Sequence, residues 1–323
     1  MTETLGDVGE FPLIERVLAD LPRGSAVAVG PGDDGAVCSI DGQVVASTDV
    51  FVEGVHFKRD WSTADEIGRK AVAAAAADLE AMGAFPVALL VAFAAPADLP
   101  AAWAEDCVRG MRQEAAQAGL SLVGGDVSAA KEITLALTVL GELRGLPPVL
   151  RSGARPGDSV ALRGRLGLAA AGLAALRHGF RSPRAVVQAF QCPTPPYGAG
   201  TEASAFGASA MIDVSDGLLA DLGHVAAASG VVIDLATDRL EVAEAIRAVA
   251  QATGGAALDF VLTGGEDHAL VATFPYGQVP ATWSVIGRVL DPAGGPAGVL
   301  VDGQPWPGAQ GWRHFAGSAA ERS

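Results

Sequence analysis

Lysine is scarce in this chain of 323 residues, which contains only Lys58, Lys70 and Lys131. Lysine and arginine together number 22 against 37 aspartates and glutamates, so the formal net charge is −15. A broad nucleic-acid-binding surface is not expected on so acidic a protein. An anionic ligand would therefore need arginine, backbone amides or metal ions to neutralise its charge.

Cysteine and long apolar runs are also scarce. The three cysteines, Cys38, Cys107 and Cys192, are odd in number and lack metal-ligand spacing, which predicts reduced thiols in a cytosolic protein rather than a disulfide framework. The most apolar run, residues 84–97, contains two prolines and is too short to cross a bilayer. Residues 1–10 are acidic and lack the basic start of a secretory signal. We expect a soluble, cytoplasmic protein with no membrane partner.

The common nucleotide and hydrolase motifs are absent. The sequence has no GxxxxGK[ST] loop, no kinase catalytic-loop motif, no GxSxG elbow and no HExxH pair. An acidic protein that handles a polyphosphate without a phosphate-loop lysine has one obvious physical route, in which Mg²⁺ ions bridge aspartates and phosphates.

Apolar runs typical of strands alternate with helical patterns along the whole chain. Strands are predicted at residues 44–48, 87–94, 120–123, 133–143, 159–162, 231–235, 270–274 and 284–289. Helices are predicted at residues 63–82, 100–118, 166–178, from 216, and at 242–252. The stretch 146–158, rich in proline, glycine and arginine, is the best candidate for a domain junction. The fold class is α/β, with α+β as its variant, in two domains, 1–146 and 147–323.

Aspartates at the predicted strand ends are the most informative feature. Asp33 and Asp34 lie in a glycine-rich loop, and Asp49 follows an apolar strand. Carboxylate oxygens of this kind are the ligands that hard divalent cations prefer. Simple turn formation by Asp and Gly explains the glycine-rich loop equally well.

Asp78 is stronger evidence for a site. On a helix it shares the apolar stripe with Ala71, Ala74 and Met82, whereas Glu80 shares a face with Arg69. A carboxylate on a buried face is costly unless it is protonated or paired. A metal ion would satisfy it, and so would an arginine from elsewhere, although cations are few.

Two further clusters combine glycine and acidic residues. Asp126 follows two glycines at a strand end, where backbone N–H groups could approach an anion. Asp213 and Asp216 flank Ser215 near a predicted helix start, where Ser215 could cap the helix or bind a phosphate. The loop 263–268 (TGGEDH) precedes another predicted strand.

Ten short motifs occur in order along nearly the whole chain. They are GEF (9–11), GDD (32–34), STD (47–49), EGVHF (53–57), DLxAMG (78–83), GGD (124–126), RSGA (151–154), DVSDGL (213–218), GGED (264–267) and GWRHF (311–315). In these motifs the chain resembles the bacterial thiamine-monophosphate kinases, which belong to the superfamily of aminoimidazole ribonucleotide synthetase and selenophosphate synthetase.

The resemblance implies the two-domain fold of that superfamily, a homodimer formed mainly through the N-terminal domains, and transfer of the ATP γ-phosphate to thiamine monophosphate. The N-terminal domain would bind metal and ATP, with Mg²⁺, or alternatively Mn²⁺, as the cofactor. The implied metal ligands are Asp34, Ser47, Thr48, Asp49, Asp78, Asp126, Asp213 and Asp216. The implied ATP contacts are Gly125, Asp126, Arg151 and Ser215. The implied thiamine-pocket residues are His56, Glu266 and Trp312.

Two departures from the family pattern and two rival functions accompany this resemblance. Ala77 stands where the family usually has serine, and His268 where tyrosine often follows GGED. The nearest rival is another ATP-using enzyme of the superfamily, although the N-terminal loop lacks the reactive cysteine and lysine of selenophosphate synthetase. The second rival is a non-catalytic acidic protein that senses divalent cations or a nucleotide.

Overall fold

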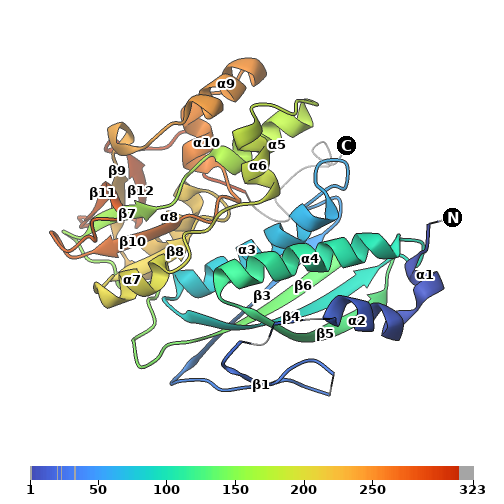
Figure 1. The fold of residues 1–323 in the computed structure, drawn as a ribbon. Coiled ribbons are helices and arrows are strands. Elements are labelled where there is room, and N and C mark those ends of the chain that lie inside the picture. Colours follow the sequence, from blue (N-terminus) through green and yellow to red (C-terminus); the bar gives the residue numbers. More distant parts are fainter. Residues whose placement is uncertain (1, 20, 23, 33, 313–323) are drawn as a thin grey trace.

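A computed structural model describes residues 2–19, 21–22, 24–32 and 34–312 (Figure 1). The helices are α1 (Leu5–Val8), α2 (Glu10–Leu18), α3 (Ala64–Ala81), α4 (Ala101–Ala118), α5 (Leu168–Arg177), α6 (Arg184–Gln191), α7 (Ala199–Ala205), α8 (Leu218–Ser229), α9 (Glu244–Thr253), α10 (Ala257–Thr263) and the 3₁₀-helix η1 (Thr237–Arg239). The strands are β1 (Val27–Val29), β2 (Val37–Cys38), β3 (Val44–Val52), β4 (Phe85–Ala95), β5 (Ser121–Ala129), β6 (Thr134–Glu142), β7 (Ser159–Arg163), β8 (Ala210–Asp213), β9 (Val232–Leu235), β10 (Leu270–Phe274), β11 (Ser284–Leu290), β12 (Gly298–Val301) and β13 (Gln304–Pro305).

The N-terminal half is built on a four-stranded sheet in the order β3-β6-β4-β5. Its β4–β5 pair is parallel, and the other two pairs are antiparallel. Helices α3 and α4 lie along one face, and β1 lies beyond the other (Figure 1). The prediction of an interior strand at residues 44–48 was wrong, because β3 is an edge of this sheet. Its burial alternates, with Val45 and Phe51 in the core and Val44 and Val50 exposed.

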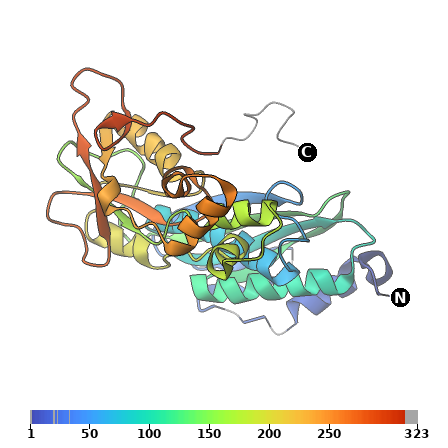
Figure 2. The ribbon, with the colours of Figure 1, turned by 90° about the horizontal axis from the view of Figure 1, so that it is seen from above.

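The C-terminal half is built on a seven-stranded sheet in the order β13-β12-β9-β11-β7-β10-β8, in which only the β12–β9 pair is parallel. Residues of α5, α6, α8, α9 and α10 share one core with it, and α7 packs with Met211 and Phe274 in a separate core. The two sheets occupy opposite ends of the molecule (Figures 1 and 2). Because both sheets are mostly antiparallel, the observed fold is the α+β variant.

Local signals placed the two long helices correctly. Thr63 and Glu66 form the predicted capping box at the start of α3, with Glu66 Oε2 accepting from the Thr63 N–H at 2.8 Å. Gly119 ends α4 in the left-handed conformation, as predicted. The helices approach so closely that a Cβ on Gly110 would lie 2.0 Å from the carbonyl oxygen of Asp65. The predicted domain junction at residues 146–158 stays a prediction.

Helix α3 is covered on all sides, which overturns the contrast drawn between Asp78 and Glu80. No residue of α3 is exposed, because the helix contacts β3 and β6, α4, and also β8 and α7 of the C-terminal half. Glu80, expected on a face shared with Arg69, is only 1% exposed. Its carboxylate accepts the N–H groups of Gly198 and Gly200 at 2.8 Å each. The prediction failed because the apolar stripe of a helix identifies only one buried face, and the C-terminal half covers another face of α3.

Replacing Glu80 with alanine should therefore destabilise the contact between the halves. The buried N–H of Gly200 and the partly buried N–H of Gly198 would lose their acceptor, which corresponds to roughly 1 to 3 kcal/mol in the free energy of unfolding. Chemical denaturation of Glu80→Ala beside the exposed-site variant Glu132→Ala measures the difference. Equal stability of the two variants would show that Glu80 does not join the halves.

The sequence predicted no membrane-spanning segment and no disulfide framework. Within the described residues, no helix combines the length and apolar composition needed to cross a membrane. Cys38, Cys107 and Cys192 are all free thiols, as predicted.

Candidate active site

Three carboxylates from both halves of the chain meet beside α3. Asp49 comes from β3, Asp78 from α3, and Asp213 from the end of β8. Ser47 and Asp49 lie on the same side of β3, since side chains alternate along a strand, and the Ser47 hydroxyl donates to Asp78 Oδ2. We call Asp49, Asp78 and Asp213 the acidic cluster.

Burial and neighbouring charge raise the pKa of two carboxylates of this cluster, Asp49 and Asp78. Burial, then the charge of Asp213, raises the pKa of Asp78 to about 6, although the Ser47 hydrogen bond opposes the shift. Burial and Asp213 also raise the pKa of Asp49, against an opposing effect of His268. No arginine in the described part of the chain pairs with Asp78. Asp78 therefore has no arginine to balance its charge in this part of the chain.

The loop 214–217 between β8 and α8 is shaped by an aspartate that the sequence did not single out. Oδ2 of Asp221 accepts the N–H groups of Ser215, Asp216 and Gly217 at 3.0 Å each. Burial and the nearby Asp213 raise the pKa of Asp221 to about 7. Helix α8 begins at Leu218 without a side-chain cap, so the capping role considered for Ser215 is wrong. The phosphate-binding role stays a prediction.

The GGED loop packs backbone against backbone on the loop 214–217. The N–H of Glu266 donates to Ser215 O at 2.8 Å. A Cβ on Gly265 would lie 2.2 Å from the same oxygen, so only glycine fits. Glu266 and His268 have φ of +66° and +51°, which is strained for residues with a Cβ. Such a conformation persists only when several contacts hold it.

Three consecutive side chains of this loop point to three different partners. Glu266 Oε2 accepts from Lys70 at 2.8 Å, and Asp267 accepts the N–H groups of Gly167 and Ala169 at the start of α5. His268 Nδ1 lies 3.1 Å from Oδ2 of Asp213. The loop thus links Asp213 of the C-terminal half to Lys70 of the N-terminal half.

His268 occupies the position where the sequence departs from the family pattern. Burial lowers the pKa of the His268 ring, but the hydrogen bond to Asp213 and the charges of Asp213, Glu266 and Asp49 outweigh burial and raise it. The acidic cluster thus favours the protonated form of His268, which would offset part of the charge of the cluster.

The three predicted thiamine-pocket residues lie around these loops. The Trp312 N–H donates to Asp216 O at 2.9 Å, and the residue is 54% exposed. His56 follows β3, where its Nδ1 accepts the Val52 N–H at 3.0 Å, so the neutral ring carries its proton on Nε2. The oxygen of His56 lies 3.5 Å from Lys70 Nζ, which also binds Glu266.

Other predicted site residues lie away from the acidic cluster. Asp49 is opposite Leu137, Leu137 opposite Val91, and Val91 opposite Gly125. Three strand spacings separate Asp49 from Gly125, which is about 14 Å. Asp126 is therefore at the far edge of the sheet, and its carboxylate accepts from Ser128.

Side-chain direction and position separate further residues from the cluster. Thr48 points to the face of the sheet opposite Ser47, where Oγ1 lies 3.2 Å from Thr138 Oγ1. Arg151 O accepts from Ser229 Oγ, at the end of α8 opposite Ser215. Asp34 is exposed in the loop between β1 and β2. Asp33 and the last three residues of the GWRHF motif lie outside the described residues.

The predicted metal ligands do not form one compact coordination site within the described part of the chain. In the described ranges, no group of three or more His, Cys, Asp or Glu side chains is arranged to hold a metal ion. Mg²⁺ usually keeps several waters and takes one or two carboxylates together with substrate phosphates. Spread aspartates with hard oxygen donors therefore suit ions that are shared with a polyphosphate.

Comparison with known proteins decides the family. Residues 32–143 and 155–296 match the families described as AIR synthase related protein, N-terminal domain and C-terminal domain. A thiamine-monophosphate kinase of Mycobacterium tuberculosis (strain CDC 1551 / Oshkosh) is 50% identical over 314 residues, covering 97% of this chain and 93% of that protein. The chain belongs to the thiamine-monophosphate kinase family.

Solved structures agree with this membership. The thiamine-monophosphate kinase of Stenotrophomonas maltophilia K279a is 32% identical, with a TM-score of 0.78, covering 90% of this chain and 95% of that chain. AaThiL complexed with AMPPCP and TMP is 31% identical, with a TM-score of 0.79, covering 98% of this chain and 100% of that chain. The predicted two-domain superfamily fold and the predicted enzyme family are confirmed.

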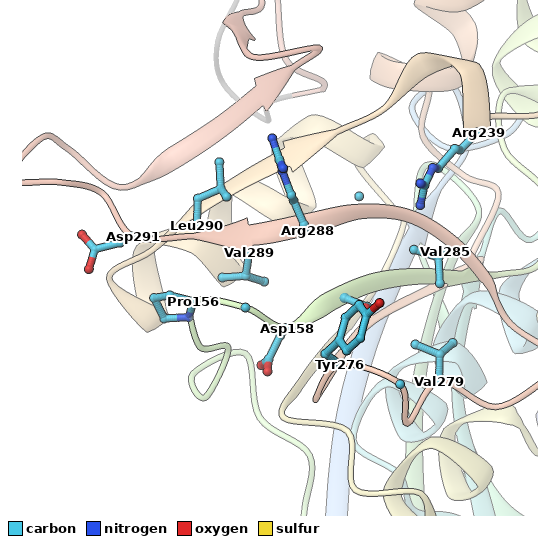
Figure 3. A pocket seen from close by; sticks show the side chains of 14 residues that line it. Pro156, Asp158, Arg239, Tyr276, Val279, Val285, Arg288, Val289, Leu290 and Asp291 are labelled. Carbon is cyan, nitrogen blue, oxygen red and sulfur yellow. The ribbon is translucent and has the colours of Figure 1, made fainter.

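A pocket of about 790 Å³ lies away from the residues that the family resemblance selected (Figure 3). Its lining comes from β11, the start of β7 and the turn after β10, with Arg239, Tyr276 and Arg288 around it. None of the predicted site residues of this kinase-family chain lines it. The acidic cluster and its two loops therefore remain the candidate active site.

Proposed function

We propose that this chain transfers the γ-phosphoryl group of ATP to thiamine monophosphate, giving thiamine diphosphate. One observation carries the proposal: in a member of this kinase family, Glu266 and Trp312 are both hydrogen-bonded to the loop 214–217, which lies next to the acidic cluster. Relatives bear the name thiamine-monophosphate kinase, and AaThiL binds AMPPCP, an ATP analogue, together with TMP. A phosphate site and an acceptor site would thus adjoin.

Several Mg²⁺ ions are the expected cofactor of this site. The mutual repulsion within the acidic cluster and the scarcity of lysine both favour divalent cations as the missing positive charge. Bound Mg²⁺ would neutralise the charge on the phosphates during transfer. The residues proposed to hold it are Asp34, Ser47, Thr48, Asp49, Asp78, Asp126, Asp213 and Asp216.

Positioning by the chain would supply most of the catalysis. Phosphoryl transfer has a loose transition state, so holding the two phosphates in line is the main requirement. The proposed ATP contacts are Gly125, Asp126, Arg151 and Ser215. The acceptor is a phosphate that is already ionised near neutral pH, so no general base is assigned. Direct transfer is expected, and radiolabel from γ-labelled ATP retained on the denatured protein would contradict it.

We also propose a homodimer formed through the N-terminal sheets. Val44 and Val50 are 55% and 50% exposed on the edge strand β3. An unpaired edge strand can pair with the edge strand of another chain, and a second copy would cover these two valines. A second copy would also bring another Asp126 to the assembly. A molecular mass of one chain in solution would contradict this, and a cytoplasmic location stays a prediction.

ADP release tests the function directly. The purified protein should release ADP with Mg²⁺, ATP and thiamine monophosphate together, and little without the acceptor. Release that needs a different phosphate or carboxylate acceptor would favour another enzyme of the superfamily. Binding of ATP or Mg²⁺ without turnover of any acceptor would favour a sensor.

Removal of divalent cations should abolish this activity. The chain has too few lysines to neutralise the nucleotide phosphates, so excess chelator is expected to lower turnover at least about 100-fold. Added Mg²⁺ or Mn²⁺ should restore it. Full turnover in excess chelator would contradict the metal-bridged site.

A further inference from the structure

We propose that Lys70 is a positioning residue of the acceptor site, which holds the Glu266 carboxylate where it meets the thiamine part of the acceptor. The inference deepens the proposed function and rests on it. Neither the ten motifs nor the predicted set of site residues includes Lys70. It is one of only three lysines in the chain.

Lys70 is a buried cation with contacts to three separate segments. It lies on α3 and is 2% exposed. Its Nζ donates to Glu266 Oε2 at 2.8 Å and lies 3.5 Å from the carbonyl oxygen of His56. The same Nζ lies 3.8 Å from the centre of the Phe190 ring. One ammonium group thus links the turn after β3, the GGED loop and α6.

The two partners of this ion pair differ in burial, so Lys70 depends on Glu266 while Glu266 can still contact a ligand. A buried ammonium without a partner costs several kcal/mol, so Lys70 requires a carboxylate, and the one it has is Glu266. The side chain of Glu266 is 32% exposed, which leaves it open to a ligand. Oε2 is taken by Lys70, and no other hydrogen bond to the Glu266 carboxylate occurs within the described residues. Oε1 is therefore the oxygen that can accept from the acceptor.

The backbone of Glu266 also depends on such support. Its φ of +66° is unfavourable for a residue with a Cβ by about 1 to 3 kcal/mol. The hydrogen bond to Ser215 holds the backbone from one side, and the Lys70 ion pair holds the side chain from the other. Loss of the ammonium would free the carboxylate to turn away from the acceptor.

Position along α3 separates this role from that of the acidic cluster. Lys70 and Asp78 are eight residues apart, which is about 12 Å along a helix. The helix thus supports the acceptor loop near its start and carries Asp78 of the acidic cluster near its end. Removing the charge of Lys70 should weaken acceptor binding and leave ATP binding nearly unchanged.

The test compares Lys70→Met with Lys131→Met, a matched change at an exposed turn. Lys70→Met should raise the KM for thiamine monophosphate about 10- to 100-fold, the loss expected for a misplaced charged hydrogen bond. The KM for ATP should change less than about twofold, and Lys131→Met should match the wild type. Calorimetry of thiamine monophosphate binding in the presence of AMPPCP should show the same loss without turnover.

A double-mutant cycle with Glu266→Gln tests the pairing itself. If Lys70 acts through Glu266, the double variant should bind thiamine monophosphate no more weakly than the weaker single variant. Additive losses, an equal rise in both KM values, or a Lys70→Met enzyme identical to Lys131→Met would overturn the proposal. If Lys70→Met does not fold, Lys70→Gln, which removes the charge but keeps a neutral donor, replaces it, with a smaller rise in the KM for thiamine monophosphate and the same unchanged KM for ATP. A wild-type protein that does not phosphorylate thiamine monophosphate would refute the proposed function instead.

Discussion

Asp78→Asn is expected to lower kcat by roughly 100- to 1,000-fold while the chain stays folded, the loss typical of removing one electrostatic contact to the reacting groups. Asparagine keeps the shape of the side chain and can still accept from Ser47, but it loses the charge that would hold a metal ion. Turnover per folded molecule should be measured beside Asp98→Asn, an exposed control.

The same substitution should stabilise the protein without metal at pH 8. The pKa of Asp78 is raised to about 6 in the folded chain, above its ordinary 3.8, so the ionised carboxylate opposes folding. This gap corresponds to at most roughly 3 kcal/mol. The penalty is complete above pH 6 and disappears as the pH falls toward 3.8. Asp78→Asn should therefore raise Tm by a few degrees at pH 8, and the difference should shrink toward pH 4.

Thermal unfolding in chelator, followed from pH 8 to pH 4, measures this effect. Asp221 and Asp267 also have raised pKa values, about 7 each, and contribute in the same direction in both proteins. The difference between the variant and the wild type therefore isolates Asp78. If Asp78→Asn lowers Tm and keeps turnover per folded molecule, Asp78 is a structural partner and not a metal ligand.

Features set by neighbours in the sequence were predictable. The Thr63 and Glu66 capping box and the Gly119 stop need only a few adjacent residues, and both were placed correctly. The partial burial of Asp78 followed from the residues on its own helical stripe. Glu80 was misjudged because its acceptor role depends on Gly198 and Gly200, which are more than one hundred positions away in the chain.

Contacts between distant segments decide most of the candidate site. Lys70 and Glu266 are 196 positions apart, and His268 and Asp213 are 55 apart, so no local pattern links them. The family resemblance selected Asp49 and Asp126 together, yet the sheet register puts them at opposite edges. Residues that share a motif set need not meet within one chain, because register and pairing place them.

Trp312→Ala and Glu266→Gln are expected to weaken acceptor binding selectively. The backbones of both residues are held by neighbouring carbonyl groups of one loop, Glu266 by Ser215 and Trp312 by Asp216. Gly265 and Gly311 precede them, and a Cβ on either glycine would collide with those oxygens. The two side chains are thus anchored at the same loop, next to the acidic cluster.

The chemistry of thiamine explains why this pair would select it. Thiamine carries a cationic thiazolium ring and an aminopyrimidine, which suit an aromatic face and a carboxylate acceptor. Loss of the indole of Trp312 should raise the KM for thiamine monophosphate roughly 3- to 30-fold. Loss of the charge of Glu266 should raise it about 10- to 100-fold. The KM for ATP should stay nearly constant in both variants.

Matched variants separate these effects from general damage. Trp312→Phe keeps an aromatic face and should retain most of the affinity, and Glu241→Gln removes a charge at an exposed site. Steady-state kinetics with each substrate varied in turn gives the two KM values. If both variants weaken ATP and thiamine monophosphate equally, or weaken neither, these residues do not form the acceptor pocket. Thiamine monophosphate as the acceptor would then be supported by family membership alone.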